Sequence, residues 1–246
     1  MTPPWTALRE RIAQGRALGT FVKLPAAEAI DLAAAQLDFA VVDLEHSQLD
    51  ELEARRLVRH AAAIGFPVLV RLPLPTRDRV NRILEAGAAG IQVPTVRSAA
   101  TVRETRDLMR YPPHGNRSIS LAQAPAAYGA TALREFLDGQ GEGPLLVAQI
   151  ETAETDDPLE RIAAAGPDVL FVGPLDLSVE LGLDDDRVRE RIAEIERTAA
   201  AAGIALGAAG IDNDAVRYDV VGSDVALLRA GLTGVAEAER KRHARD

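Results

Sequence analysis

Two acidic residues, Glu151 and Asp176, each follow a short apolar segment of the chain. If those segments are neighbouring parallel strands, both carboxylates lie at the same end of the sheet. There they can share one hard cation such as Mg²⁺ or Mn²⁺ and leave coordination positions open for substrate and water. The alternative is that each is a loop acid or a helix cap, which is the commoner role of a single Asp or Glu. Position alone leaves both interpretations open.

His46 is a candidate general base. An imidazole with an ordinary pKa of about 6.5 exchanges protons near neutral pH, as acid–base catalysis requires. A loop histidine taken alone is more often just solvated, and His60, His114 and His243 have no evident role. The residue type therefore makes His46 a candidate and no more.

Arg71 ends an apolar run at residues 68–70, where an unpaired guanidinium would be costly to bury. It therefore needs an anion or a carbonyl oxygen as a partner. In one interpretation it forms a salt bridge with Asp43 or Glu45, and in the other it stabilises the negative charge of an enolate. We count Asp43 with the catalytic group as the residue that orients His46 or Arg71.

These residues need a scaffold that brings several strand ends together. Short apolar runs alternate with longer helical patterns along the whole chain, which is typical of parallel βαβ units. We therefore predict an α/β fold, a single-domain (β/α)8 TIM barrel over residues 1–246, with its chemistry at the carboxyl ends of the strands. The predicted strands are 19–23, 39–43, 67–71, 90–94, 145–150, 169–173, 204–208 and 224–228.

The longest stretch without a predicted element spans residues 110–129. It lies between the fourth and fifth predicted strands, and we expect it on the catalytic face of the barrel. A loop of this length in a compact domain usually has a function or forms an interface.

Composition excludes several classes of protein. At 246 residues, with 47% hydrophobic and 26% charged residues, the chain can bury a substantial core. A formal net charge of −9 and scattered basic residues argue against a nucleic-acid partner. No apolar run approaches the roughly 20 residues of a membrane-spanning helix, so we expect a cytoplasmic protein with no membrane partner.

Cysteine and lysine usage limits the chemistry further. The chain has no cysteine, so any metal must be bound by oxygen or imidazole, which favours a hard cation. Its two lysines are Lys23 and Lys241, and the second lies in a charged C-terminal segment. A Schiff-base mechanism therefore has Lys23 as its one candidate.

Several of these residues lie in longer segments whose order along the chain carries a resemblance. The segments are Leu18-Gly19, Asp43-Leu44-Glu45-His46, Val70-Arg71-Leu72-Pro73, Arg110-Tyr111-Pro112-Pro113 with Gly115 and Arg117, Gln149-Ile150-Glu151-Thr152, and Gly173-Pro174-Leu175-Asp176-Leu177-Ser178. Together they resemble the class II pyruvate aldolases, the family of 4-hydroxy-2-oxoheptanedioate and 2-keto-3-deoxy sugar-acid aldolases. The family fold is a barrel of the phosphoenolpyruvate/pyruvate type.

The resemblance implies a carbon–carbon lyase that reversibly cleaves a 4-hydroxy-2-oxo acid to pyruvate and an aldehyde. It implies that Glu151 and Asp176 bind a divalent cation, Mg²⁺, Mn²⁺ or Co²⁺, which pyruvate chelates through its carboxylate and keto oxygens. His46 is then the base, acting through water, and Arg71 stabilises the enolate oxygen.

The resemblance also assigns substrate contacts and an assembly. Gln149 contacts pyruvate or metal-bound water, and the backbone N–H of Leu175 holds the pyruvate carboxylate. Glu85 stands where the family has an acidic residue that reaches a histidine of a neighbouring subunit and raises its basicity. The family forms trimers paired into hexamers, so a homo-oligomer with shared sites, a trimer or a homohexamer, is expected. The substrate-binding set implied is Arg71, Gln149, Gly173, Pro174, Leu175 and Asp176.

Three places depart from the family pattern. Residues 118–120 stand where the family has a glycine-rich stretch, and Gln123 stands where it has an arginine. Lys23 replaces a small residue at the end of the first strand, where it either contacts an acidic substrate or pairs with a carboxylate. Because these positions face the aldehyde portion, the resemblance does not specify the aldehyde.

Three alternatives remain open at the level of sequence. An acyl-CoA lyase of the malyl or citramalyl type has a similar fold and metal carboxylates, but it should need a basic, adenine-accepting rim that the chain does not clearly show. A Schiff-base aldolase depends on Lys23 alone. A catalytically silent barrel could bind a keto acid without turnover, since fold does not fix function.

Overall fold

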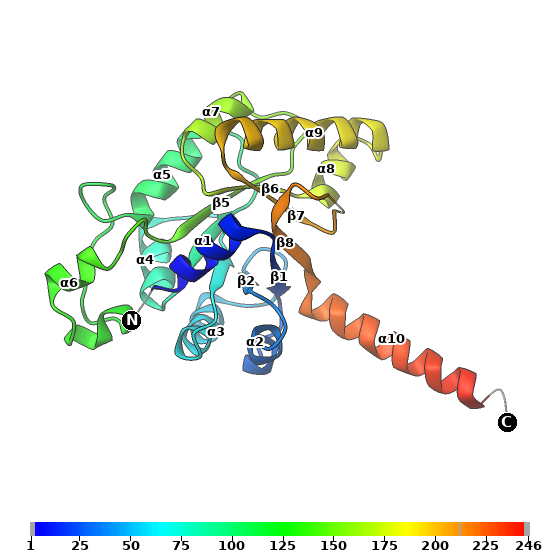
Figure 1. Ribbon diagram of the computed structural model, residues 1–246, viewed down its shortest axis with the longest axis horizontal. Helices are drawn as coiled ribbons and strands as arrows, with labels where there is room; N and C mark the ends of the chain where they lie inside the picture. The colour runs from blue at the N-terminus through cyan, green and yellow to red at the C-terminus, as the bar shows by residue number, and fades with distance from the viewer. Residues whose placement is uncertain (1–2, 212, 244–246) are drawn as a thin grey trace.

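The chain forms a closed barrel of eight parallel strands with helices around it, in a computed structural model that describes residues 3–211 and 213–243 (Figure 1). Each strand pairs with the next one along the chain, and β8 closes the barrel by pairing with β1. This confirms the predicted fold class. The strands are β1 (Ala17–Val22), β2 (Phe39–Asp43), β3 (Val68–Arg71), β4 (Gly90–Val93), β5 (Leu145–Ile150), β6 (Val169–Val172), β7 (Ala205–Ala209) and β8 (Val216–Ser223).

The helices connect and surround these strands. One short 3₁₀ helix, η1 (Ala124–Gly129), lies between α5 and α6. The α-helices are α1 (Pro4–Gln14), α2 (Ala27–Ala34), α3 (Glu51–Ala63), α4 (Arg77–Glu85), α5 (Ala99–Met109), α6 (Leu133–Asp138), α7 (Leu159–Ala164), α8 (Pro174–Glu180), α9 (Asp185–Ala202) and α10 (Asp224–His243).

Alternate residues of each strand face the inside of the barrel, because side chains of a strand point to opposite faces in turn. In β2, Phe39 and Val41 pack in the interior, whereas Val42 packs against the surrounding helices. Trp5 and Leu8 of α1 join the interior cluster. Helix α1 therefore closes the N-terminal end of the barrel and leaves the opposite end, where the strands terminate, for the site.

The eighth predicted strand, 224–228, is wrong. Those residues begin α10, and the last strand is β8, which ends one residue earlier. The Asp224 carboxylate accepts hydrogen bonds from the backbone N–H groups of Lys23 and Leu24, which holds the start of α10 at the end of β1. Leu227 and Leu228 are 45% and 56% exposed, whereas a strand of a closed barrel is buried on both faces. The other seven predicted strands lie within two residues of the observed ones.

The segment 110–129 does not lie on the catalytic face, so that expectation is also wrong. It follows α5 rather than β4, and α5 carries the chain back along the barrel before the segment begins. Its first residue, Arg110, lies 3.9 Å from Asp168, which directly precedes β6. Its Tyr128 ring lies 5.5 Å from the guanidinium of Arg59, in the second half of α3. Both contacts are at the N-terminal end of the barrel.

Helix α10 extends away from the rest of the chain (Figure 1). None of its residues is buried, although Leu228, Leu232 and Val235 give it an apolar side. No helix in the described part of the chain is both long enough and apolar enough to cross a membrane. Helix α10 has 20 residues, but its C-terminal half is charged.

Candidate active site

The polar residues of the candidate site continue the inward-facing rows of the barrel. Asp43 lies two residues after the inward-facing Val41 at the end of β2. Arg71, Gln149 and Glu151 stand in the corresponding rows of β3 and β5. The lining of the barrel therefore changes from apolar to polar at the carboxyl ends of its strands, where catalytic groups of such barrels lie.

Asp43 and Arg71 form a buried ion pair. They are opposite each other in the β2–β3 register, and the Nε and Nη2 groups of Arg71 donate to Asp43 Oδ1 and Oδ2 at 2.8 and 2.5 Å. Oδ1 also accepts from the backbone N–H groups of Glu45 and His46, at 3.0 and 3.2 Å. Burial acts to raise the pKa of Asp43, but these hydrogen bonds and the charge of Arg71 outweigh it and lower the pKa to about 2. Asp43 is therefore an anion that ties Arg71 to the backbone of the His46 loop.

Arg71 has further partners that fix its orientation. Its Nη1 lies 3.3 Å from Glu45 Oε2, and its guanidinium lies over the ring of Phe21, 4.5 Å from the centroid. Burial raises the pKa of Glu45, and the nearby Glu151 adds to this, while Arg71 acts in the opposite direction. Both salt bridges considered for Arg71 are present, and they hold a cation at the mouth of the barrel.

His46 and Lys23 lie next to this pair. The His46 side chain is 55% exposed, and its Nε2 lies 3.7 Å from Glu45 Oε2. Lys23 Nζ lies 3.2 Å from Asp43 Oδ2 and donates to the backbone carbonyl of His46 at 3.1 Å. Of the two roles expected for Lys23, the structure has the pairing with a carboxylate. His46 is thus an accessible imidazole on a backbone that two charged side chains hold.

Glu151 is a buried carboxylate whose described contacts include no cationic side chain. Its Oε1 accepts from the backbone N–H and Oγ1 of Thr95, at 2.7 and 2.9 Å, and its Oε2 accepts from Gln149 Nε2. Gln149 Oε1 in turn accepts from Gln92 Nε2 at 2.6 Å. A Cβ atom on Gly173 would collide with Glu151 Oε2, so this position must be glycine for the carboxylate to keep its place. The network orients an oxygen ligand suited to a hard cation.

Asp176, the second expected ligand, lies in the first turn of α8 and is exposed, as is Leu175 beside it. Pro174 opens the helix and Gly173 caps it. Among the described residues, no three His, Asp or Glu side chains gather into a preformed metal cluster. The oxygen donors of Glu151 and Asp176 fit a hard divalent cation in kind, with substrate and water completing its coordination.

Glu85 is not near the other candidate residues. It ends α4, at the end of the barrel opposite to His46, and lines a cavity of about 410 Å³ with Arg55, Arg59 and Tyr128. Within one chain it therefore does not contact the candidate base, and only a neighbouring chain could bring the two residues together.

Two residues of the site were not singled out from the sequence. Gln92 holds Gln149, and it could have been found because it lies in the inward row of β4 after Gly90. Thr95 holds Glu151 from a backbone with φ of 51°, which is uncommon for a non-glycine residue. No pattern in the sequence predicts that backbone conformation.

Known proteins are similar to this chain in sequence and in fold. The family model described as HpcH/HpaI aldolase/citrate lyase matches residues 18–237. A hydroxypyruvate/pyruvate aldolase of Paraburkholderia phytofirmans is 35% identical over 198 residues, with 76% of this chain and 75% of that protein covered. A 4-hydroxy-4-methyl-2-oxoglutarate aldolase of Hapsidospora irregularis is 33% identical over 187 residues, with 73% and 69% covered. The crystal structure of an HpcH/HpaI aldolase from Desulfitobacterium hafniense superposes with a TM-score of 0.85 at 28% identity, covering 95% of this chain and 96% of that one.

Proposed function

This chain belongs to the HpcH/HpaI aldolase/citrate lyase family, and we propose that it reversibly cleaves a 4-hydroxy-2-oxo acid to pyruvate and an aldehyde. The relatives named above are aldolases, so we assign this chain to the aldolases, which are carbon–carbon lyases. The proposed site rests chiefly on the ion pair between Asp43 and Arg71. This pair fixes the Arg71 guanidinium and the backbone of the His46 loop next to each other at the mouth of the barrel.

In the cleavage direction His46 takes the proton of the 4-hydroxyl group, acting through water. The hydroxyl oxygen becomes the aldehyde oxygen, the bond between C3 and C4 breaks, and its electron pair becomes the pyruvate enolate. Arg71 stabilises the enolate oxygen with a charge that is already oriented and partly dehydrated. Return of the proton to C3 gives pyruvate and restores the imidazole.

We propose that Glu151 and Asp176 hold a divalent cation, with Mg²⁺ or Mn²⁺ as the first candidates. When bound, such an ion supplies Lewis-acid polarisation of the 2-oxo group and binds the substrate carboxylate. Two features support this assignment: the donors to Glu151 orient its carboxylate, and Gly173 leaves room beside it. Gln149 and the backbone N–H of Leu175 remain the proposed contacts for pyruvate.

The alternatives have less support. The two relatives above are named as aldolases of pyruvate or of a 4-hydroxy-2-oxo acid, which favours the aldolase over an acyl-CoA lyase. Lys23, the one candidate for a Schiff-base nucleophile, lies 3.2 Å from Asp43 Oδ2 and donates to the His46 carbonyl, so its Nζ is engaged with the protein instead of being free to attack a keto group.

We further propose that the chain works as a homo-oligomer, a trimer or a hexamer. The apolar side chains of α10 are exposed to solvent in one chain, and burying them against another copy is favourable. Glu85 could then approach the site of a neighbour. Sedimentation velocity would measure the assembly directly, and a monomer at all concentrations would rule it out.

The experiment for the activity is a panel of 4-hydroxy-2-oxo acids assayed for pyruvate release with Mg²⁺ or Mn²⁺, in parallel with EDTA. His46→Ala and Glu151→Ala provide the matched inactive variants. Metal-dependent release that both substitutions abolish supports the aldolase. No release from any substrate while the cation is bound would favour the acyl-CoA lyase or the silent binder.

A further inference from the structure

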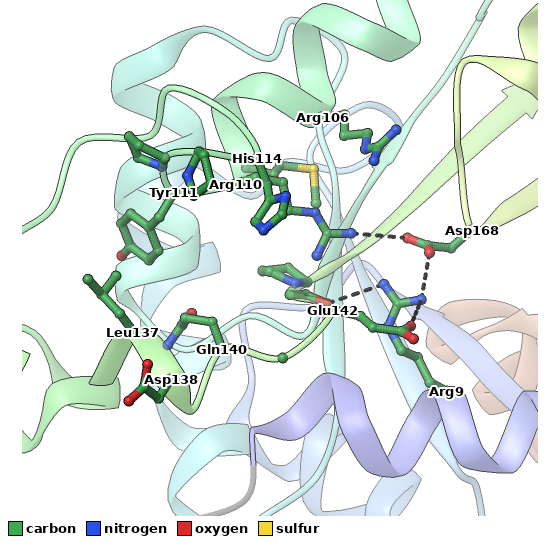
Figure 2. Close-up of a pocket in the computed structure, with 16 residues that line it drawn as sticks. Arg9, Arg106, Arg110, Tyr111, His114, Leu137, Asp138, Gln140, Glu142 and Asp168 are labelled. Carbon is green, nitrogen blue, oxygen red and sulfur yellow. Dashed lines mark hydrogen bonds and ion pairs between the residues drawn. The ribbon is translucent and has the colours of Figure 1, made fainter. Parts of the chain in front are cut away.

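A second cavity lies at the N-terminal end of the barrel, away from the candidate active site. Its volume is about 690 Å³. Its walls are α1, the end of α5 with residues 110–114, the turn at 140–144 before β5, and Asp168 before β6 (Figure 2). None of the residues assigned to the aldolase site lines it. The cavity therefore needs an explanation that goes beyond the proposed function.

Three arginines, Arg9, Arg106 and Arg110, lie around the half-buried Asp168 on one side of this cavity (Figure 2). Arg9 Nη1 binds Asp168 Oδ1 at 2.5 Å, and the other oxygen of Asp168 accepts from the backbone N–H of Leu146 at 2.7 Å. Arg110 Nη2 stays 3.9 Å from the same carboxylate, beyond hydrogen-bond distance. Both oxygens of Asp168 thus have closer partners than Arg110, and the positive charge of Arg110 is only partly balanced.

Arg110 is largely buried without a side-chain hydrogen bond in the described part of the chain. Its side chain is 14% exposed, and its Nη1 is fully buried with no partner. Burial lowers the pKa of Arg110, and the charges of Arg9 and Arg106 lower it further, against the effect of Asp168. A guanidinium in this environment is costly unless an anion compensates it.

Two glycines make room for the arginines that lack close partners. Gly143 and Gly166 have positive φ angles of 74° and 89°. A Cβ atom on Gly143 would collide with Arg110 Nη1, and one on Gly166 would lie 2.5 Å from Arg106 Nη1. Both guanidinium groups therefore lie against bare backbone, which leaves them room at the cavity.

The opposite side of the cavity is different in character. Tyr111 and Leu137 lie there (Figure 2), and Pro112 and Pro113 add to the apolar lining of the cavity. The two further acids, Asp138 and Glu142, belong to the rim, and Glu142 is 81% exposed and 3.5 Å from Arg9. The cavity thus combines guanidinium groups without close side-chain partners on one side with apolar surface on the other.

We propose that this cavity binds a small organic dianion, whose acidic groups pair with Arg110 and Arg106 and whose carbon framework lies against the apolar wall. Paired charge-assisted hydrogen bonds to two guanidinium groups favour a ligand with two carboxylate or phosphate groups over one with a single charge. The site is separate from the strand ends, so its test does not depend on aldolase activity.

The single tryptophan of the chain provides a local readout. Trp5 Nε1 donates to the backbone carbonyl of Gln140 at 3.2 Å, and Gln140 lines the cavity. The experiment is a titration of the full-length, Mg²⁺-loaded protein with succinate, followed by Trp5 fluorescence, with acetate and succinamide as singly charged and neutral comparators. We expect a saturable change with succinate and a much weaker response to the other two.

Substitutions of the cavity arginines test whether succinate binds in this cavity. Arg110→Gln should weaken succinate binding about tenfold or more, since it removes a charge-assisted pair. Arg106→Gln should weaken it in the same direction, and because Arg106 is exposed, this variant keeps the test valid if Arg110→Gln does not fold. Arg103→Gln on the same helix, outside the cavity, is the matched control and should bind as the parent does. No saturable change in the parent, or equal binding by the parent and both cavity variants, would overturn the proposal.

Discussion

Replacing Arg71 with methionine removes the cation that organises the candidate site. Arg71 donates two hydrogen bonds to Asp43, a carboxylate with no solvent exposure. In Arg71→Met the carboxylate keeps only Lys23 and the backbone N–H groups of Glu45 and His46 as partners. We therefore expect the pKa of Asp43 to rise and the folded state to lose stability.

The pKa of Asp43 sets the size of this loss. At about 1.4 kcal/mol per pKa unit, a decrease from 3.8 to about 2 stabilises the folded state by about 2.5 kcal/mol at neutral pH. Because the folded pKa is the lower one, this stabilisation is complete above about pH 4 and disappears as the pH falls towards 2. Breaking a buried ion pair costs about 3–5 kcal/mol in general, so we expect Arg71→Met to lose about 2–4 kcal/mol at pH 7.

Urea unfolding of the parent and Arg71→Met between about pH 2 and 8 measures this loss, because this range covers both the folded pKa of about 2 and the unfolded value of 3.8. The variant should also lose about 10²–10³-fold or more in kcat for pyruvate release, since its enolate loses a preorganised cation. Lys23→Met is the control. It removes the other cation at Asp43, but Lys23 is 25% exposed, so we expect a loss of about 1 kcal/mol or less. Equal stability of Arg71→Met and the parent at pH 7 would show that the ion pair between Asp43 and Arg71 does not stabilise the folded state.

Three further predictions concern neighbouring residues. His46→Gln should reduce kcat about 10²–10⁴-fold in steady-state assays while the protein still binds pyruvate, and an unchanged kcat would assign the proton transfer to another group. Gly173→Ala should weaken binding of Mg²⁺ or Mn²⁺ in a calorimetric titration, because its Cβ displaces the Glu151 carboxylate, and activity should return at high metal concentration. The pKa of Glu45 is higher in the folded protein than in the unfolded chain, so ionisation of Glu45 destabilises the folded state once the pH exceeds the unfolded pKa. Glu45→Gln should therefore be more stable than the parent at pH 7 in urea unfolding. A less stable variant would contradict burial as the cause of the raised pKa.

The sequence predicted those parts of the fold that follow from local periodicity. Strand β5 is buried along its whole length and apolar except at Gln149, and it was placed with its observed bounds. The prediction of the eighth strand failed because the apolar run at 225–228 fits a strand as well as a helix; in the structure it belongs to the first turns of α10, whose Asp224 accepts hydrogen bonds from the end of β1. The segment at 110–129 was assigned to the wrong end because its position depends on where α5 ends.

For the candidate site, sequence reasoning identified the charged residues but not all of their partners. A salt bridge of Arg71 with Asp43 or Glu45 was one of two interpretations from the sequence, and the barrel register places Arg71 opposite Asp43. Gln92 and Thr95 were missed because their contribution is to orient Gln149 and Glu151, which depends on a side-chain network between adjacent strands. Such contacts depend on the three-dimensional register rather than on residue type.

We propose that the oxygen ligands and Arg71 stabilise the enolate of pyruvate at the strand ends. Exchange of the pyruvate methyl protons for deuterium, followed by NMR in D₂O, tests this most directly because it needs no knowledge of the aldehyde. We expect exchange that requires Mg²⁺ or Mn²⁺, stops with EDTA, and is lost in Glu151→Gln and Arg71→Met. Exchange that persists in EDTA but is lost in Lys23→Met would contradict it in favour of a Schiff base, and no exchange with the cation bound would contradict enolate formation altogether.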